Sequence, residues 1–281
     1  MLFGVFSMSE NRKTSSINQL DLLTIISISI IVFIIQNVLH EFIGHGGATW
    51  LVGGKVTSFT TAYLENDLSS VSSFGKRIVA AAGPTLNVFI GLIAWLLLKI
   101  YKKKLNSVTF FFWLTMTVNL FTGTGYFFFS GISGIGDLID VIHGVNQLWA
   151  WRIGMIVVGI ISYFAVILLS LKELNQFLRH DNQNRNKSAI RLSLVPFLAG
   201  SIASTIGAFF NPISFLFVFT SAASTFGGTS GLAWMTQLFS TKWFPINTNS
   251  SIEINRSWFW IILSFVFLII HIFIIGPGIN F

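Results

Sequence analysis

The chain has 281 residues, of which 53% are hydrophobic and only 10% are charged; it contains no cysteine and has a formal net charge of +7. Soluble domains carry about a quarter charged residues, so this composition excludes an ordinary soluble protein and indicates an integral membrane protein. The absence of cysteine excludes disulfides and thiolate metal sites, and the positive charge is typical of basic cytoplasmic loops rather than of nucleic-acid binding.

The first part of the chain reads as a polar tail followed by a long apolar helix. Residues 1–21 are predicted to be a tail and not a cleavable signal, because basic residues follow the short apolar run. The apolar pattern then runs from Leu22 to about Val52. This exceeds one membrane crossing of roughly 20 residues and predicts a long, tilted or broken helix. Residues 53–76 are polar and are expected to form a partly re-entrant loop.

The rest of the chain contains clear apolar spans and one ambiguous region. The clear spans cover residues 77–98, 108–130, 149–171 and 258–275. Residues 192–238 fit best as two spans broken at Asn211-Pro212, because Pro212 lacks a backbone donor and disfavours helix at Asn211. We therefore predict an all-α, polytopic membrane protein with six or seven transmembrane helices.

The expected organisation has three parts. They are a polar tail at 1–21, a core at 22–145 that would carry the chemistry, and C-terminal transmembrane helices at 146–281. Basic residues cluster before the first span, after the second and after the fourth. This pattern predicts a multi-pass protein of the plasma (inner) membrane with its N-terminus in the cytoplasm.

The stretch LHEFIGHGG, residues 39–47, ends the first apolar segment. It nearly matches the zinc motif His-Glu-x-x-His, but three residues instead of two separate Glu41 from His45. In a regular helix, residues five apart point about 140° away from each other, so His40 and His45 could not share a metal ion. A π-bulge absorbs one residue and restores a common face, and Gly44 lies where the backbone has to deform. The spacing therefore predicts an irregular turn around Gly44.

Polar residues are concentrated here: Gln36, Asn37, His40, Glu41 and His45 lie within ten residues of an otherwise apolar segment. An ionisable group at membrane depth costs about 2.5–3.5 kcal/mol on insertion scales, and by default suggests a functional site. The plainer alternative is a set of polar residues that merely lie close together. Their number favours a metal site.

A catalytic zinc site usually takes three protein ligands and leaves one position for water. The carboxylates nearest to apolar surroundings are Asp137 and Asp140, in the stretch SGISGIGDLIDVIHG. His143 lies in the same stretch and is a further candidate. The residues alone leave the choice among these three open.

Two resemblances add to this interpretation. HEFIGH is similar to the zinc motif of dipeptidyl peptidase III, in which one residue is inserted in the same way. HEFIGH at 40–45, AAGPTLNVFIGL at 81–92 and GIGDLIDV at 134–141 also resemble, in order and approximate spacing, three marks of the site-2 protease family of intramembrane zinc metalloproteases. The resemblance covers about residues 25–145. The longer histidine spacing and the lack of the family's Asn-x-x-Pro…Asp-Gly pattern are departures from it.

The resemblance to the site-2 proteases implies a similar core in the first half of the chain. It implies that His40, His45 and Asp137 bind Zn²⁺, that Glu41 is the general base, and that Asn87 binds substrate. Asp140 would then be a neighbour of the ligands or an alternative ligand.

The expected function is a zinc-dependent, membrane-embedded endopeptidase that hydrolyses peptide bonds in or near transmembrane segments. Its partners would be a membrane-protein or peptide substrate and the lipid bilayer, without nucleic acid. One alternative is a catalytically inactive protein of the same fold that binds client helices. A transporter is a further alternative, because intramembrane polar residues also mark ion pathways, but the chain shows none of the internal repeats common in transporters.

Overall fold

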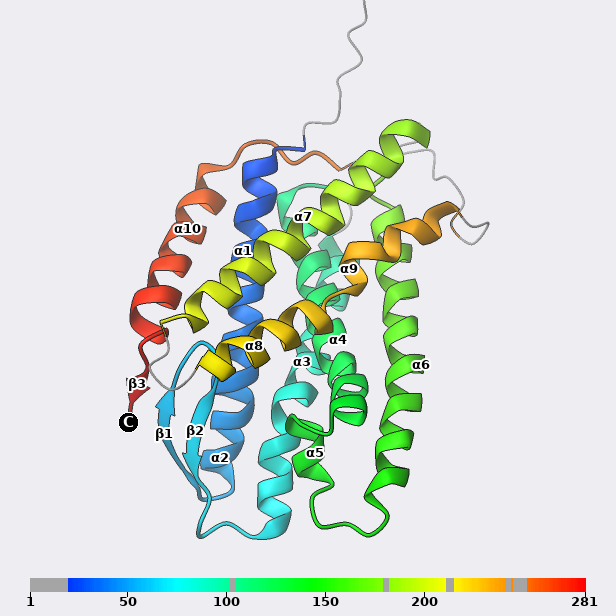
Figure 1. Cartoon of the computed structure of the whole chain (residues 1–281). Coiled ribbons are helices and arrows are strands. Elements are labelled where there is room, and N and C mark those ends of the chain that lie inside the picture. The colour runs from blue at the N-terminus through cyan, green and yellow to red at the C-terminus, as the bar shows by residue number, and fades with distance from the viewer. Residues whose placement is uncertain (1–19, 102–104, 179–181, 211–214, 241–243, 245–251) are drawn as a thin grey trace, which may run out of the picture.

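The computed structural model of the chain describes residues 20–101, 105–178, 182–210, 215–240, 244 and 252–281. It is mostly helical, as predicted, with one small sheet. Its long helices run side by side or cross obliquely (Figure 1). The longer elements before the chain midpoint are α1 (Leu22–Val38), α3 (Ser73–Tyr101) and α4 (Ser107–Ser133). Those after it are α6 (Leu148–Asn175), α7 (Asn182–Ala208), α8 (Phe215–Gly228) and α10 (Trp258–Ile269).

Five helices in the described part of the chain are long and apolar enough to cross a membrane. They cover Leu22–Leu51, Ser73–Tyr101, Leu148–Asn175, Arg185–Ala208 and Trp258–Ile275. By length and composition, the described residues therefore provide five candidate spans, fewer than the six or seven expected. Helix α4 is 27 residues long, but its threonines, glycines and Asn119 lower its hydropathy. The ambiguous region contains two helices, α7 and α8, as expected, but α8 has only 14 residues and is not among the candidate spans. The expected break at Asn211-Pro212 lies outside the described residues.

The first span is one continuous helix with an irregular segment inside it. Helix α1 leads directly into a π-helix, η1 (Leu39–Gly46), which leads into α2 (Gly47–Leu51). The chain therefore stays helical for 30 residues. The predicted long and irregular first helix is confirmed.

The segment expected to be a polar loop instead contains a β-hairpin. Strand β1 (Lys55–Phe59) pairs antiparallel with β2 (Leu64–Asp67), with an irregularity between Val56 and Ser58. The C-terminal strand β3 (Ile279–Asn280) pairs with the other side of β1, so the strand order is β2-β1-β3. Residues in β1 alternate poorly between polar and apolar types, which is why the periodicity did not predict a strand. Pairing with a distant C-terminal segment supports the hairpin.

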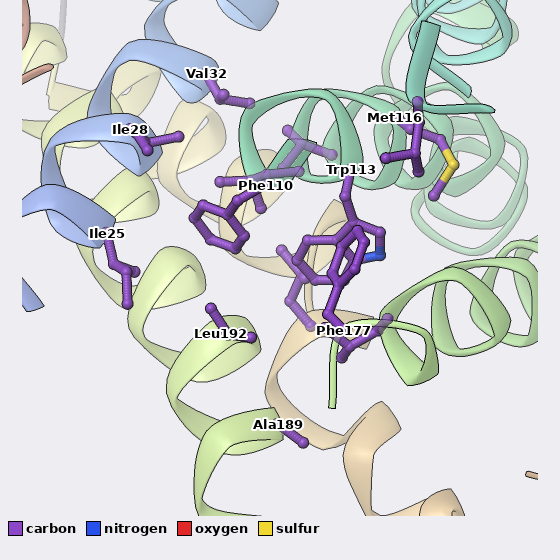
Figure 2. Packing of buried hydrophobic residues seen from close by; sticks show 14 of the residues in the cluster. Ile25, Ile28, Val32, Phe110, Trp113, Met116, Phe177, Ala189 and Leu192 are labelled. Carbon is purple, nitrogen blue, oxygen red and sulfur yellow. The ribbon is translucent and has the colours of Figure 1, made fainter. Parts of the chain in front are cut away.

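The main apolar core lies where α1, α4 and α7 meet (Figure 2). Inside a bilayer, helices associate through close packing and not through release of water, so the fit between side chains decides stability. A Cβ on Gly200 of α7 would lie 2.2 Å from the Phe33 ring of α1, so glycine permits the contact between these two helices. Trp113 of α4 donates its indole N–H to the carbonyl of Ser170 in α6 over 3.0 Å. The side chains labelled in this core are Ile25, Ile28, Val32, Phe110, Trp113, Met116, Phe177, Ala189 and Leu192.

The remaining elements are short. They are α5 (Asp137–Val141), α9 (Gly231–Trp234), a 3₁₀ turn η2 (Met235–Ser240) and a second π-helical segment η3 (Ile270–Ile275) that ends the last span. Helix α5 follows α4 after a turn at Gly134 and Gly136, whose φ values of 73° and 91° favour glycine. This turn sends the chain back toward the first span.

Asp21 ties the start of α1 to the start of α10. Its Oδ1 caps α1 by accepting the Thr24 backbone N–H over 2.9 Å, and its Oδ2 accepts two hydrogen bonds from Arg256 at 2.9 and 3.0 Å. Burial alone would raise the pKa of Asp21, but the hydrogen bonds from Arg256 and Thr24 outweigh it and lower the pKa below its ordinary value of 3.8. The ionised carboxylate therefore stabilises the folded state above about pH 4, and this contribution is lost as the pH falls further.

Asp21→Asn is expected to destabilise the protein slightly, by at most about 1 kcal/mol, because asparagine caps a helix as well as aspartate does and only the exposed ion pair is lost. Asp21→Ala also removes the cap and should cost about 1 kcal/mol more. Thermal unfolding in detergent measures both. The difference between wild type and Asp21→Asn should shrink below about pH 4, and a difference that grows there would contradict the assignment.

Candidate metal centre

The π-helix η1 places His40 and His45 on one side of the first span. Its hydrogen bonds connect residues five apart, so side chains with this spacing share a face. The two Nε2 atoms lie 3.3 Å apart, and the ring planes meet at 81°. The predicted irregular turn is therefore confirmed. Gly44 contributes through close approach and not through unusual φ, because a Cβ there would lie 2.8 Å from the Cα of Gly83 in α3.

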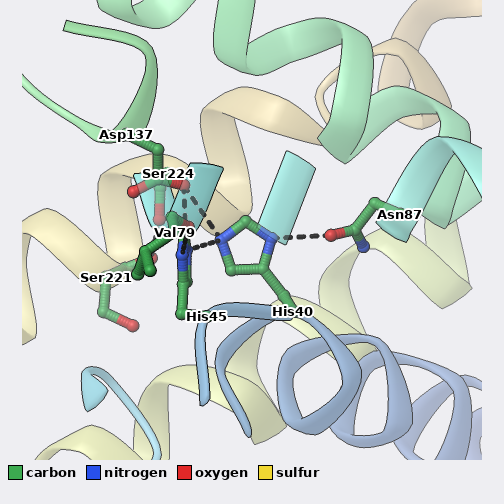
Figure 3. A network of polar contacts seen from close by, with 7 residues as sticks. All are labelled: His40, His45, Val79, Asn87, Asp137, Ser221 and Ser224. Atoms are coloured by element: carbon green, nitrogen blue, oxygen red, sulfur yellow. Dashed lines mark hydrogen bonds and ion pairs between the residues drawn. The ribbon is translucent and has the colours of Figure 1, made fainter. Parts of the chain in front are cut away.

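Asp137, the first residue of α5, supplies a third polar atom. Its Oδ2 lies 3.1 Å from His40 Nε2 and 3.3 Å from His45 Nε2. Figure 3 shows both rings with these nitrogens turned toward the Asp137 carboxylate. Within the described chain, these three residues are the group of His, Asp and Glu side chains whose arrangement could hold a metal ion.

The far side of each ring fixes which nitrogen carries the proton. His45 Nδ1 donates to the backbone carbonyl of Val79 in α3 over 2.8 Å, because a carbonyl oxygen can only accept. His40 Nδ1 lies 2.6 Å from Oδ1 of Asn87, also in α3, and donates to it (Figure 3). With Nδ1 protonated in both rings, the Nε2 lone pairs point toward each other and toward Asp137.

Positive charge between these three atoms, from protons or from a metal ion, would stabilise this arrangement. A single proton could form a hydrogen bond between only two of the three atoms, whereas a metal ion can bind all three at once. In a tetrahedral site with bonds of about 2.0 Å, ligand atoms lie about 3.3 Å apart. The separations of 3.1–3.3 Å between the three atoms fit this geometry.

Helix α3 leaves room for the two imidazoles at Gly83. A Cβ there would lie 2.5 Å from His45 Nε2 and 2.8 Å from His40 Nε2. Tyr126 of α4 covers the other face of His40, with ring centres 4.9 Å apart and planes at 17°. Sequence reasoning gave no role to Gly83 or Tyr126. For Gly83, its position inside the AGPTLN stretch was a feature of the sequence that could have pointed to a role at the site.

Asn87 has a different position from the one expected of a substrate-binding residue. Its side chain is only 1% exposed, and it holds His40 Nδ1 instead of facing the cavity. Its Nδ2 donates to Oδ1 of Asn119 over 3.0 Å, and Asn119 in turn donates to the Thr115 carbonyl over 2.9 Å. This buried chain of amides fixes the orientation of the Asn87 carbonyl. We therefore assign Asn87 a positioning role in place of substrate binding.

Replacing Asn87 with alanine should weaken metal binding by about 10- to 100-fold, because His40 loses the partner that holds its ring and its tautomer. A competition titration with a zinc chelator measures this. Asn66→Ala is the matched control, because Asn66 lines the cavity but bonds Thr49 Oγ1 over 3.0 Å and neither histidine. Equal affinities for both variants would contradict the role of Asn87.

The metal-capable group lies in a cavity of about 780 Å³. Glu41, Asp140 and His143 also line this cavity, whereas Asp140 and His143 lie outside the three-residue group that could hold a metal. The structure therefore brings together His40, His45 and Asp137, and leaves the two rival ligands at the cavity wall. Desolvation and the nearby Asp137 charge raise the pKa of Asp140.

The C-terminal part of the chain completes the cavity wall. Ser221 and Ser224 of α8 line it, and Figure 3 shows both near His45 and Asp137. Their small hydroxyl side chains gave no motif in the sequence. The cavity is thus not confined to the predicted core at 22–145.

Comparison with protein-family models, with curated proteins and with solved structures finds no match to this chain. What the protein does must therefore be inferred from the geometry of the site itself.

Proposed function

We propose that this protein is a zinc-dependent endopeptidase embedded in the membrane, which hydrolyses peptide bonds in or near transmembrane segments. The observation that carries the proposal is the convergence of three lone pairs, from His40, His45 and Asp137, within 3.3 Å in a cavity that Glu41 also lines. Two imidazoles and one carboxylate, with a fourth position left for water, are a donor set typical of catalytic zinc.

Zinc held there would supply a Lewis acid that lowers the pKa of water to about 7. Glu41 follows His40 directly in η1, so its carboxylate belongs to the same helical turn as the two histidines. As general base, Glu41 accepts a proton from the attacking water, and it then returns this proton to the departing amine. His40, His45 and Asp137 stay fixed by Asn87, Val79 and the glycine turn before α5.

Strand β2 offers a place for an extended substrate. It lies at the edge of the sheet, and Leu64 and Asn66 of this strand line the cavity with Glu41. An extended peptide can add to a sheet edge through main-chain hydrogen bonds. A helical backbone has its carbonyl groups occupied, so a transmembrane substrate must first unwind locally. These features favour a peptide substrate over a small solute.

Zinc content tests the first half of the proposal. Purified wild-type protein should hold about one zinc ion per chain by elemental analysis, and His45→Ala and Asp137→Asn should lose it, because two ligands seldom hold zinc alone. His143→Ala is the matched control, because His143 lines the cavity outside the ligand group. Loss of zinc in His143→Ala, with retention in Asp137→Asn, would contradict the assigned ligand set.

Hydrolysis tests the second half. A detergent-solubilised membrane-protein substrate should be cleaved by the zinc-loaded protein and not after chelation. Zinc binding without cleavage of any membrane-protein substrate would contradict the endopeptidase and leave a client-binding protein of the same fold. Absence of zinc at any stoichiometry would reject both catalysis and the proposed ligands.

A further inference from the structure

The long helices define two ends of the molecule, and hydrogen bonds connect the elements at each of them. What we call the basic end contains the starts of α1, α7 and α10 and the ends of α3 and α6 (Figure 1). Asp21 and Arg256 join α1 to α10 there, and Lys99 bonds Glu173 between α3 and α6. Arg185 of α7 donates to the side chain of Asn175 over 2.6 Å.

What we call the hairpin end contains α2, α5, the β-hairpin, the starts of α3 and α6 and the end of α4 (Figure 1). Arg77 near the start of α3 donates to the His143 carbonyl over 3.1 Å. Arg152 near the start of α6 donates to the carbonyls of Gly131 and Ile132 at the end of α4, over 2.9 and 2.7 Å. Two of the cations at this end therefore cap backbone carbonyls.

The metal-capable group lies close to the hairpin end. His45 precedes the end of α2 at Leu51 by six residues, and its partner Val79 follows the start of α3 by six residues. At 1.5 Å per residue, both helices place the group roughly 9 Å from this end, whereas the rest of α3 extends about 33 Å toward the basic end. Exposed residues at the cavity wall, Lys76 and His143, also belong to the hairpin end. The cavity wall therefore reaches the exposed surface of the hairpin end.

Exposed aromatic side chains mark both ends as membrane interfaces. Trp50, Trp149 and Trp151 are exposed at the hairpin end, and Tyr101 and Trp258 are exposed at the basic end. Trp and Tyr concentrate at the two surfaces of a bilayer. With 29 residues, α3 is about 43 Å long, which matches a bilayer of 40–45 Å including its headgroups.

Basic residues are distributed unequally between these interfaces. Of the chain's 17 lysines and arginines, four lie at the hairpin end and six at the basic end among the described residues. The other seven lie outside the described residues, and three of them, at 102–104, follow Tyr101, the last residue of α3, directly in sequence. Lysine and arginine accumulate on the cytoplasmic side of membrane proteins. The four at the hairpin end are Lys55, Lys76, Arg77 and Arg152, and the six at the basic end are Lys99, Lys172, Arg185, Lys187, Arg191 and Arg256.

We infer that the hairpin end faces away from the cytoplasm, so that the metal-capable group receives water and substrate from the non-cytoplasmic side of the membrane. This orientation limits the class of substrate, an inference that rests on the proposed endopeptidase function. This class comprises membrane-protein segments in about the outer third of the bilayer or just beyond its outer surface, since the group lies roughly 9 Å below that surface. Segments at the cytoplasmic surface are out of reach.

Single-cysteine labelling tests this orientation directly, because the native chain has no cysteine and each variant carries one thiol. Ser70→Cys and Asn146→Cys place a thiol in two exposed loops of the hairpin end, and Asn186→Cys places one on the exposed start of α7 at the basic end. Ser224→Cys places one in the cavity wall. A small, charged thiosulfonate reagent that cannot cross membranes is applied to right-side-out vesicles before and after permeabilisation.

The two loop variants and Ser224→Cys should be labelled equally before and after permeabilisation, and Asn186→Cys only afterwards. Labelling of Asn186→Cys from outside, with protection of both loops, would overturn the orientation. Protection of Ser224→Cys while both loops react would overturn the entry route. Labelling requires neither zinc nor hydrolysis, so a protein that fails every catalytic test still reports its orientation.

Discussion

Glu41→Gln is expected to lower the rate of peptide hydrolysis by about 10²- to 10⁴-fold while zinc content stays unchanged. The amide has nearly the same shape as the carboxylate but cannot accept a proton from water, and general acid–base catalysis contributes about this factor. Glu41 is not among the three residues whose atoms converge, so the metal-capable group should persist. Hydrolysis of a solubilised membrane protein and elemental analysis of the same preparation measure the two quantities.

Glu65→Gln is the matched control for this prediction. Glu65 lies on β2, is exposed and does not line the cavity. Its substitution should leave both hydrolysis and zinc content unchanged. Full activity in Glu41→Gln would reject the proposed base, even if zinc remains bound.

Gly83→Ala is expected to disrupt the metal centre without a change at any ligand. The added Cβ would lie 2.5 Å from His45 Nε2 and 2.8 Å from His40 Nε2, so the rings must move by about 1 Å or α3 must shift. A displacement of this size costs about 10²-fold in activity, and zinc affinity should fall as well because the three lone pairs no longer converge. Chelator competition and hydrolysis assays measure these losses.

Gly47→Ala provides the comparison, because a Cβ at Gly47 meets nothing within 4 Å although Gly47 lies two residues after His45. Alanine favours a helix over glycine by about 1 kcal/mol, so this variant should be as stable as wild type or more so. Retention of zinc affinity in a folded Gly83→Ala protein would show that α3 does not shape the site. Size-exclusion chromatography and thermal unfolding establish that both variants fold.

Local spacing made parts of the site predictable. His40 and His45 lie five residues apart, and a π-helical turn is the local geometry that brings such a pair to one face. Asp137 was foreseen as a candidate because few carboxylates lie in apolar surroundings, and the resemblance favoured it over Asp140. The long first helix and most span boundaries followed from apolar run length in the same way.

The contributions of distant segments were not predictable. Asn87 was expected at the substrate, yet the packing of α3 against η1 turns its carbonyl toward His40 Nδ1. The residues of the hairpin were expected to form a loop. Strand β1 is paired on one side with β3 near the C-terminus, and this contact exists only in the folded chain, so the local sequence could not indicate it. Ser221 and Ser224 belong to a helix far along the sequence, and nothing in their own neighbourhood places them beside the cavity.

By itself, the sequence determined that the chain forms helices long and apolar enough to cross a membrane, that the first of them must deform between His40 and His45, and which side chains could bind a metal. Composition and short-range helical geometry fix these properties, since they depend on residues within a few turns of each other. The tertiary structure decided the third partner, the protonated nitrogen of each ring, the cavity wall and the distance of the site from each end. These depend on contacts between helices distant in sequence, where packing at Gly44, Gly83 and Gly200 sets how closely the backbones approach.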